Sequence, residues 1–258
     1  MAKILVITNQ KGGVGKTTTA VNLAASLAAT DQRVLLVDLD PQGNATMGSG
    51  VNKGQLRKSV YHVLLGAAPV DQVRLRSEQG GYDVLPANRE LGGAEIELVE
   101  IDARETRLKT ALASVDDDYD YVLIDCPPAL NLLTLNGLVA ADRVMIPMQC
   151  EYFALEGLTD LVNTLRKVRS GLNPGIEIEG LLRTMFDPRS TLAQQVAEQL
   201  KQHFGDKVYN TMIPRNVRLA EAPSHGLPAL VYDKSSKGAQ AYLALAQELL
   251  EKQPAAVV

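Results

Sequence analysis

The chain has 258 residues, of which 46% are hydrophobic and 22% charged, and its formal net charge is −4. A chain this long can bury roughly seven-tenths of its unfolded surface, so the fold requires no metal or disulfide to stabilise it. The net charge excludes a protein coated in basic residues, although a local basic patch remains compatible with it.

The sequence also argues against export and membrane insertion. Two cysteines, Cys126 and Cys150, are too few for a disulfide framework. No run of about eighteen apolar residues predicts a transmembrane helix. The first apolar run, residues 4–7, is too short for the core of a signal peptide and is typical of a buried strand. We therefore expect a cytoplasmic protein with reduced thiols.

Short apolar runs alternate with helical patterns along the whole chain. Strands are predicted over 3–8, 34–38, 83–85, 121–125, 144–148, 178–185 and 208–211. Helices are predicted over 17–29, 90–114, 130–140, 155–171, 191–204 and 237–252. This alternation predicts right-handed βαβ units in a single α/β domain over residues 1–258. Its twisted, mostly parallel sheet would be covered by helices on both faces, with ligands beyond the carboxyl ends of the strands.

The segment between the first strand and the first helix is rich in glycine and reads Gln-Lys-Gly-Gly-Val-Gly-Lys-Thr-Thr at residues 10–18. Glycines let a backbone bend closely around phosphates, and the amide hydrogens of a helix N-terminus bind the anion. Gln10 replaces the first glycine of the strict phosphate-loop pattern, and Lys11 adds a second lysine. A Gly-rich turn without a ligand is the alternative. The predicted nucleotide-binding residues are Lys11, Gly12, Gly13, Val14, Gly15, Lys16, Thr17 and Thr18.

Two acidic strand ends supply what a nucleotide hydrolase needs. Asp125 ends an apolar strand, where a carboxylate can hold Mg²⁺ through water, and the Thr17 hydroxyl can ligate the same ion. Asp38 and Asp40 point to one side of an extended segment, so one could assist Mg²⁺ while the other positions the attacking water. The alternatives are an ordinary strand-end aspartate and a turn built from Asp, Pro, Gly and Asn.

Together these motifs resemble the deviant Walker A signature of the ParA/MinD group of ATPases, and the ParA (Soj) branch most closely. The resemblance covers essentially the whole chain. It includes Asp-Leu-Asp-Pro-Gln-Gly-Asn-Ala-Thr at 38–46, Asp-Cys-Pro-Pro at 125–128, Ile-Pro-Arg-Asn-Val-Arg-Leu at 213–219 and Glu-Ala-Pro-Ser-His-Gly at 221–226. It implies a P-loop ATPase that uses ATP and Mg²⁺ and turns over slowly by itself.

The resemblance also implies roles for individual residues. Lys11 would be the signature lysine, reaching across an ATP-dependent homodimer to the partner's phosphates. Lys16 and Asp40 would be the other catalytic residues, with Asp40 needed for hydrolysis. Thr17, Asp38 and Asp125 would form the Mg²⁺ site. Pro214 and Asn216 are similar to the family's adenine-contacting positions.

Basic residues gather between Asp160 and Gln240, where Lys and Arg outnumber Asp and Glu. Arginines bind phosphates regardless of base sequence, although a solvated surface is the ordinary explanation for such residues. In Soj-like proteins the ATP-bound dimer binds DNA non-specifically, and a ParB-like centromere-binding protein stimulates hydrolysis. The resemblance therefore implies nucleoid association and DNA contacts by Arg183, Arg189, Arg215 and Arg218. Because the chain begins with the ATPase strand, we expect no N-terminal helix-turn-helix domain.

Two other functions remain open. A MinD-like regulatory ATPase would bind membrane through a basic amphipathic C-terminal helix. Residues 248–258 instead contain two glutamates and a terminating proline, which favour a core helix with a frayed end and no membrane contact. A metabolic P-loop ATPase of the same superfamily would activate a small carboxylate. An iron–sulfur cluster on Cys126 is disfavoured against a buried free thiol, because prolines follow it directly.

Overall fold

The computed structural model describes residues 1–252 of the chain. Within these residues eight strands form one sheet in the order β3-β4-β2-β5-β1-β6-β7-β8. Neighbouring strands pair in parallel, except that β3 and β4 are antiparallel. The strands are β1 Lys3–Ile7, β2 Val34–Asp38, β3 Leu75–Ser77, β4 Tyr82–Leu85, β5 Tyr121–Asp125, β6 Arg143–Met148, β7 Glu177–Phe186 and β8 Val208–Pro214.

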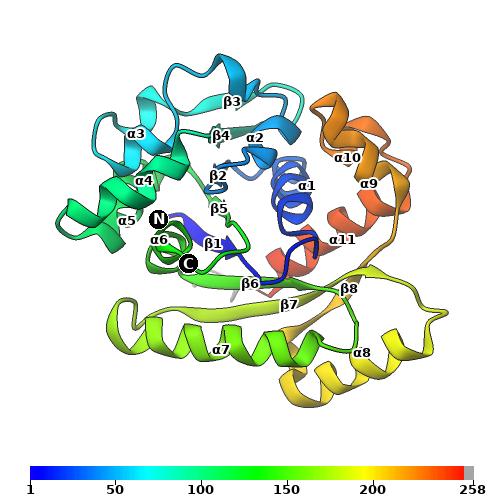
Figure 1. Cartoon of the computed structure of the whole chain (residues 1–258). Helices are drawn as coiled ribbons and strands as arrows, with labels where there is room; N and C mark the ends of the chain where they lie inside the picture. The colour runs from blue at the N-terminus through cyan, green and yellow to red at the C-terminus, as the bar shows by residue number, and fades with distance from the viewer. Residues whose placement is uncertain (253–258) are drawn as a thin grey trace, which may run out of the picture.

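Helices cover both faces of the sheet (Figure 1), so the predicted α/β architecture is confirmed. One hydrophobic core packs α1, α9, α10 and α11 against one face, and the other packs α3 to α8 against the opposite face. The helices are α1 Lys16–Ala28, α2 Asn44–Gly48, α3 Val60–Leu64, α4 Leu91–Glu97, α5 Arg107–Leu112, α6 Leu132–Ala140, α7 Ala154–Gly171, α8 Thr191–Phe204, α9 Val217–Glu221, α10 Ala229–Tyr232 and α11 Lys237–Glu251.

The predicted helix over 90–114 is wrong, because the structure breaks it into α4, α5 and short 3₁₀ turns. The break lies at Ala103, whose φ of 54° lies in the left-handed region and cannot continue a helix. Asn136 of α6 stabilises the start of α5 after this break. Its side-chain oxygen accepts from the Leu108 amide at 3.1 Å, and its amide group donates to the Arg104 carbonyl at 2.8 Å.

The sheet register brings the two acidic strand ends together. Asp38, the last residue of β2, lies directly opposite Asp125, the last residue of β5, and Asp125 also lies opposite Ile7 at the end of β1. The phosphate loop therefore leaves the sheet beside both aspartates. This arrangement follows from parallel strands of equal length, whose carboxyl ends meet at one edge.

The last strand is fastened to the last helix by a carboxylate. Glu248 of α11 accepts hydrogen bonds from the backbone amides of Asn210 and Thr211, at 2.7 and 2.8 Å. The Arg183 guanidinium donates to the carbonyls of Tyr209 and Asn210 in the same stretch of β8. Side chains thus pair with the backbone where the β7–β8 register shifts.

The C-terminal helix α11 packs as a core helix. Tyr242, Leu245, Ala246 and Leu249 are buried against the face that α1 also covers. In the part of the chain that the structure describes, no helix is long and apolar enough to cross a membrane. The proposed fraying and the terminating Pro254 lie outside the described residues.

Candidate nucleotide-binding site

The phosphate loop joins β1 to α1 with its concave side open. Gly13 and Gly15 have φ values of 72° and 88°, which side-chain-bearing residues adopt only with strain. A methyl group placed on Gly12 or Gly13 would meet no atom within 4 Å, so space remains there for a ligand. Thr184 of β7 fixes the loop, because its hydroxyl donates to the Val14 carbonyl at 2.7 Å.

Two adjoining cavities lie over this loop. The first, of about 330 Å³, is bordered by the loop, Asp40, Asn44 and Pro128. The second, of about 200 Å³, lies between the loop and the end of β8. Both are lined by Gly15, Thr18 and Met185, so they form one continuous site. The first cavity, over the glycine-rich loop, is suited to phosphate groups, and the second is lined mainly by apolar side chains.

Lys16 lines the phosphate cavity. Its ammonium group donates to the Lys11 carbonyl at 3.1 Å, so the loop itself holds the cation over the cavity. Burial lowers the pKa of Lys16, and the nearby Asp125 opposes this shift. A desolvated ammonium group beside a concave ring of amides is well placed to bind phosphate oxygens.

Asp125 is fully buried, and both of its carboxylate oxygens are without a hydrogen-bond partner. Burial raises its pKa well above 3.8 and the charge of Asp38 adds to the rise. The nearby Thr17 hydroxyl lowers the pKa but does not reach hydrogen-bonding geometry. A buried carboxylate without partners destabilises the ligand-free fold unless a cation or water satisfies it.

Asp38 is buried too, but its oxygens are engaged. One accepts from the Asp40 amide at 3.1 Å, and the other from the amide and hydroxyl of Thr46 at 2.8 and 2.7 Å. Burial raises the pKa of Asp38 to about 6, against these hydrogen bonds. Asp38 therefore fixes the loop that carries Asp40, whose partly exposed carboxylate borders the phosphate cavity.

The site fits Mg²⁺ with few protein ligands. Among the described residues, no group of three or more His, Cys, Asp or Glu side chains is arranged to hold a metal ion. Magnesium bound with a nucleotide needs none, because phosphate and water oxygens supply most of its ligands. The unpaired oxygens of Asp125 beside the Thr17 hydroxyl are suited to the remaining contacts, while the Asp38 oxygens already accept hydrogen bonds.

Lys11 is not among the residues that line the phosphate cavity. Its ammonium group contacts a Glu151 oxygen at 2.5 Å, and both side chains are about half exposed. Tyr152 and Phe153 follow, 77% and 68% exposed, with their rings edge to face. Exposed aromatic side chains beside a nucleotide site are typical of a surface that binds another protein.

Pro214 and Asn216 both line the second cavity, where the resemblance places adenine. The Asn216 side chain also accepts from the Arg218 and Leu219 amides and so caps α9. Sequence reasoning missed Met185 and Tyr242, which line the same cavity. Met185 is the last residue of a predicted strand, and this position could have indicated that it lies near a ligand site. Tyr242 has no local signal, because only the packing of α11 on α1 brings it there.

The four predicted DNA-contacting arginines differ in environment. Arg189 and Arg218 are exposed and paired, Arg189 with Asp187 and Arg218 with Glu221 and Asp233. Arg215 is exposed at the rim of the base cavity. Arg183 is half-buried and bonded to the backbone of β8, so its guanidinium is already committed within the fold.

Both cysteines are buried free thiols, as predicted for Cys126. Burial raises the pKa of Cys126 well above 9.0 and that of Cys150 to about 11. Cys126 packs closely against the middle of α6, because a methyl group on Gly137 would lie 2.9 Å from its sulfur atom. The thiol therefore fills core space beside the phosphate loop.

The sequence and structure match known ATPases over nearly their full length. A family profile described as an AAA domain matches residues 2–178. The chain is 57% identical to the sporulation initiation inhibitor protein Soj of Bacillus subtilis, over 96% of this chain and 98% of that protein. It is 53% identical to the chromosome partitioning protein ParA of Caulobacter vibrioides, over 97% and 95%.

Solved structures show the same fold. A Mycobacterium smegmatis protein described as cobyrinic acid a,c-diamide synthase, with an ATP analogue and magnesium bound, superposes with a TM-score of 0.85. It is 40% identical, over 97% of this chain and 95% of that one. The cell division ATPase MinD of Pyrococcus furiosus is 27% identical with a TM-score of 0.80, over 97% and 99%. The chain belongs to the ParA/Soj family of chromosome-partitioning ATPases, within the ParA/MinD superfamily.

Proposed function

We propose that this protein is a DNA-segregation ATPase that alternates between a DNA-bound, ATP-closed homodimer and a free form. The observation that carries the proposal is the position of Lys11. Its ammonium group lies outside its own phosphate cavity, while Lys16 alone reaches inward. A cation supplied by a partner subunit strongly favours phosphoryl transfer. The identity of 53% to a ParA protein and 57% to a Soj protein, over nearly the full length of each, supports the same proposal.

Hydrolysis would be slow and would depend on Asp40. The bound Mg²⁺ would neutralise phosphate charge, held through Thr17 and Asp125. Asp40 borders the phosphate cavity beside Asn44 and Pro128, where its carboxylate can orient a water molecule. Asp38 would act as a positioning residue, because it bonds the Asp40 amide and is itself held by Thr46. By analogy with the family, a ParB-like partner would accelerate this step.

DNA would bind to Arg189, Arg215 and Arg218. Hydrogen bonds from Arg189 lower the pKa of Asp187 to about 2, and the charges of Arg189 and Arg215 add to this effect, so both arginines lie near the same carboxylate. Exposed ion pairs contribute about 1 kcal/mol or less, so these arginines can exchange carboxylates for DNA phosphates. A dimer doubles the contacts. Arg183 is the weakest candidate, because its guanidinium already bonds the β8 backbone. Such binding would place the protein on the nucleoid.

The decisive experiment is DNA co-sedimentation of the Asp40→Ala variant with Mg²⁺ and either ATP or ADP. We expect binding with ATP only, weakening as salt rises, because phosphate contacts release counterions. Adding Arg189→Ala should reduce the salt slope by about 1, while Arg57→Ala, an exposed arginine elsewhere, should not. If the protein forms the ATP-dependent dimer but binds no DNA, the proposed segregation mechanism is wrong, although the protein can still be an ATPase.

A second candidate is an ATPase that activates a small carboxylate. The observation in its favour is the 40% identity to the Mycobacterium smegmatis protein described as a cobyrinic acid a,c-diamide synthase. Phosphate release measured with cobyrinic acid and with DNA separates the two functions. Stimulation by the acid, without any effect of DNA, would favour the metabolic enzyme.

A further inference from the structure

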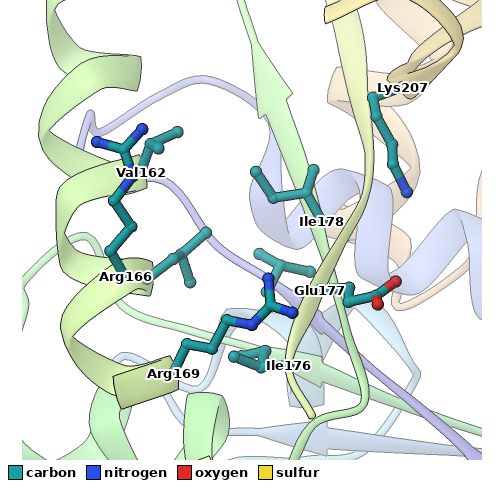
Figure 2. Close-up of a pocket in the computed structure, with 9 residues that line it drawn as sticks. Val162, Arg166, Arg169, Ile176, Glu177, Ile178 and Lys207 are labelled. Carbon is teal, nitrogen blue, oxygen red and sulfur yellow. The ribbon is translucent and has the colours of Figure 1, made fainter. Parts of the chain in front are cut away.

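A separate cavity of about 330 Å³ lies between α7 and the start of β7 (Figure 2). It is at the opposite end of the strands from the phosphate loop, because Val144 and Ile178 begin β6 and β7 while Thr184 and Met185 end β7. Its apolar lining consists of Val144, Val162, Leu165, Ile176 and Ile178. The volume falls at the small end of the range for small-molecule sites.

Two cations without partners face this apolar lining. Arg169 extends from α7 toward β7, and Lys207, at the end of the 3₁₀ turn Gly205–Lys207, borders the cavity from the other side of the β7 ribbon (Figure 2). Within residues 1–252 neither side chain forms an ion pair or a hydrogen bond. Arg166 lies about one turn before Arg169 in α7, and its side chain forms a hydrogen bond only with Asn163, at 3.1 Å.

The one acidic side chain of the lining is already neutralised. Glu177 forms an ion pair with Arg143. The cavity therefore presents an uncompensated positive charge above a hydrophobic floor. Isolated cations beside apolar surface favour a ligand that combines one anionic group with a short hydrocarbon body, since each part then meets its complement.

We propose that this cavity binds a small anionic amphiphile, with its carboxylate or phosphate group between Arg169 and Lys207 and its hydrocarbon body on Ile178 and Val162. Burial of the hydrocarbon body supplies the affinity, and the two cations supply the orientation. The site is distinct from the nucleotide site, and it stands whether or not the protein segregates DNA.

The test is calorimetric titration of the full chain with octanoate, octyl phosphate and octanol. We expect saturable binding of the two anions at one site and much weaker binding of octanol. Arg169→Gln and Lys207→Gln should each weaken binding of the anions about tenfold, since a charge-assisted hydrogen bond is lost. A lower dissociation constant for octyl phosphate would identify a phosphate ester as the class of ligand. A lower dissociation constant for octanoate would identify a carboxylic acid.

Two controls keep the result interpretable. Val162→Phe fills the cavity while keeping both cations, and it should abolish binding of both anions. Arg57→Gln removes an exposed arginine elsewhere and should leave binding unchanged. Melting curves and ATP turnover of every variant report on folding. The proposal is overturned if neither anion saturates, if octanol binds equally well, or if the variants at the cavity bind like wild type.

Discussion

Asp125 is unfavourable for the ligand-free fold, and in the proposed function it helps to hold Mg²⁺. Its two oxygens are buried without partners, beside the hydroxyl of Thr17. We expect Asp125→Asn to fold at least as stably as wild type without ligand, because a buried charge is removed. Mg²⁺-dependent nucleotide affinity should fall about 10- to 100-fold.

Thermal melting with ATP, in the presence and absence of Mg²⁺, measures this effect. The control is Asp102→Asn, an exposed aspartate between α4 and α5. An Asp125→Asn protein that keeps the full Mg²⁺-dependent rise in melting temperature would show that the ion is held elsewhere.

Glu151 pairs with Lys11 within the same chain, at 2.5 Å. In the proposed dimer this contact would have to break before Lys11 reached the partner's phosphates. Exposed ion pairs of this kind contribute about 1 kcal/mol or less, so Glu151→Gln should tighten ATP-dependent dimerisation about two- to fivefold.

Sedimentation of the Asp40→Ala protein with Mg²⁺ and ATP, with and without Glu151→Gln, gives the dimer dissociation constants. Glu156→Gln removes an exposed carboxylate in the first turn of α7 and serves as the matched control. Equal constants for all three proteins would show that the ion pair does not restrain Lys11.

At the residue scale, the sequence predicted groups whose chemistry is tied to a local pattern. The glycines, Lys16 and the strand-end aspartates lie at one edge of the sheet, because the β1–α1 loop and the parallel strands fix their positions, while their roles stay predictions. Glu151 could not be predicted as a partner of Lys11. The two are distant in sequence, and only the β1–β6 pairing brings their loops together.

Glu248 governs how the last helix is attached to the last strand. Partial burial raises its pKa, but the Thr211 and Asn210 amides and Lys252 outweigh that effect and lower it below 4.5. A lowered carboxyl pKa stabilises the fold above the unfolded pKa, and this stabilisation is lost as pH falls through the folded value.

Glu248→Gln should therefore reduce the free energy of unfolding by about 1–2 kcal/mol at neutral pH. The difference from wild type should shrink as pH falls below 4.5. Urea unfolding across this pH range measures it, with Glu251→Gln, exposed on the same helix, as control. A difference that is independent of pH would contradict the assigned role of the ionised carboxylate.

At the scale of elements, hydrophobic runs predicted the buried parallel strands well, because such strands are apolar along their whole length. Edge strand β3 was missed, since Leu75 and Arg76 are exposed and no apolar run marks it. The break at Ala103 was missed for another reason. It depends on hydrogen bonds from Asn136, which follows more than thirty residues later.

For the whole molecule, both hydrophobic cores share the central strands β1, β2 and β5, and these strands also carry the nucleotide site. We therefore expect one cooperative unfolding transition. Far-ultraviolet dichroism and tyrosine fluorescence should coincide, because the chain has no Trp and Tyr82, Tyr121, Tyr209 and Tyr242 are buried.

Mg²⁺ and ATP should raise the free energy of unfolding by about 2.7 kcal/mol when the ligand is at one hundred times its dissociation constant. The increase should be the same whether it is measured by dichroism or by fluorescence. Two separated transitions, or a ligand effect on only one signal, would show that the two faces of the sheet unfold independently. The overall architecture was predictable because alternating strands and helices permit few arrangements. The base cavity was only partly predictable, since Tyr242 reaches it from the far end of the chain.

The attachment of β8 has a further consequence for how the molecules behave at high concentration. An open sheet ends in strands whose free amides and carbonyls can pair with another chain and begin aggregation. In β8 the Asn210 and Thr211 amides are occupied by Glu248, and the Tyr209 and Asn210 carbonyls by Arg183. Side chains thus occupy these four backbone groups of the edge strand, which disfavours its pairing with a strand of another molecule.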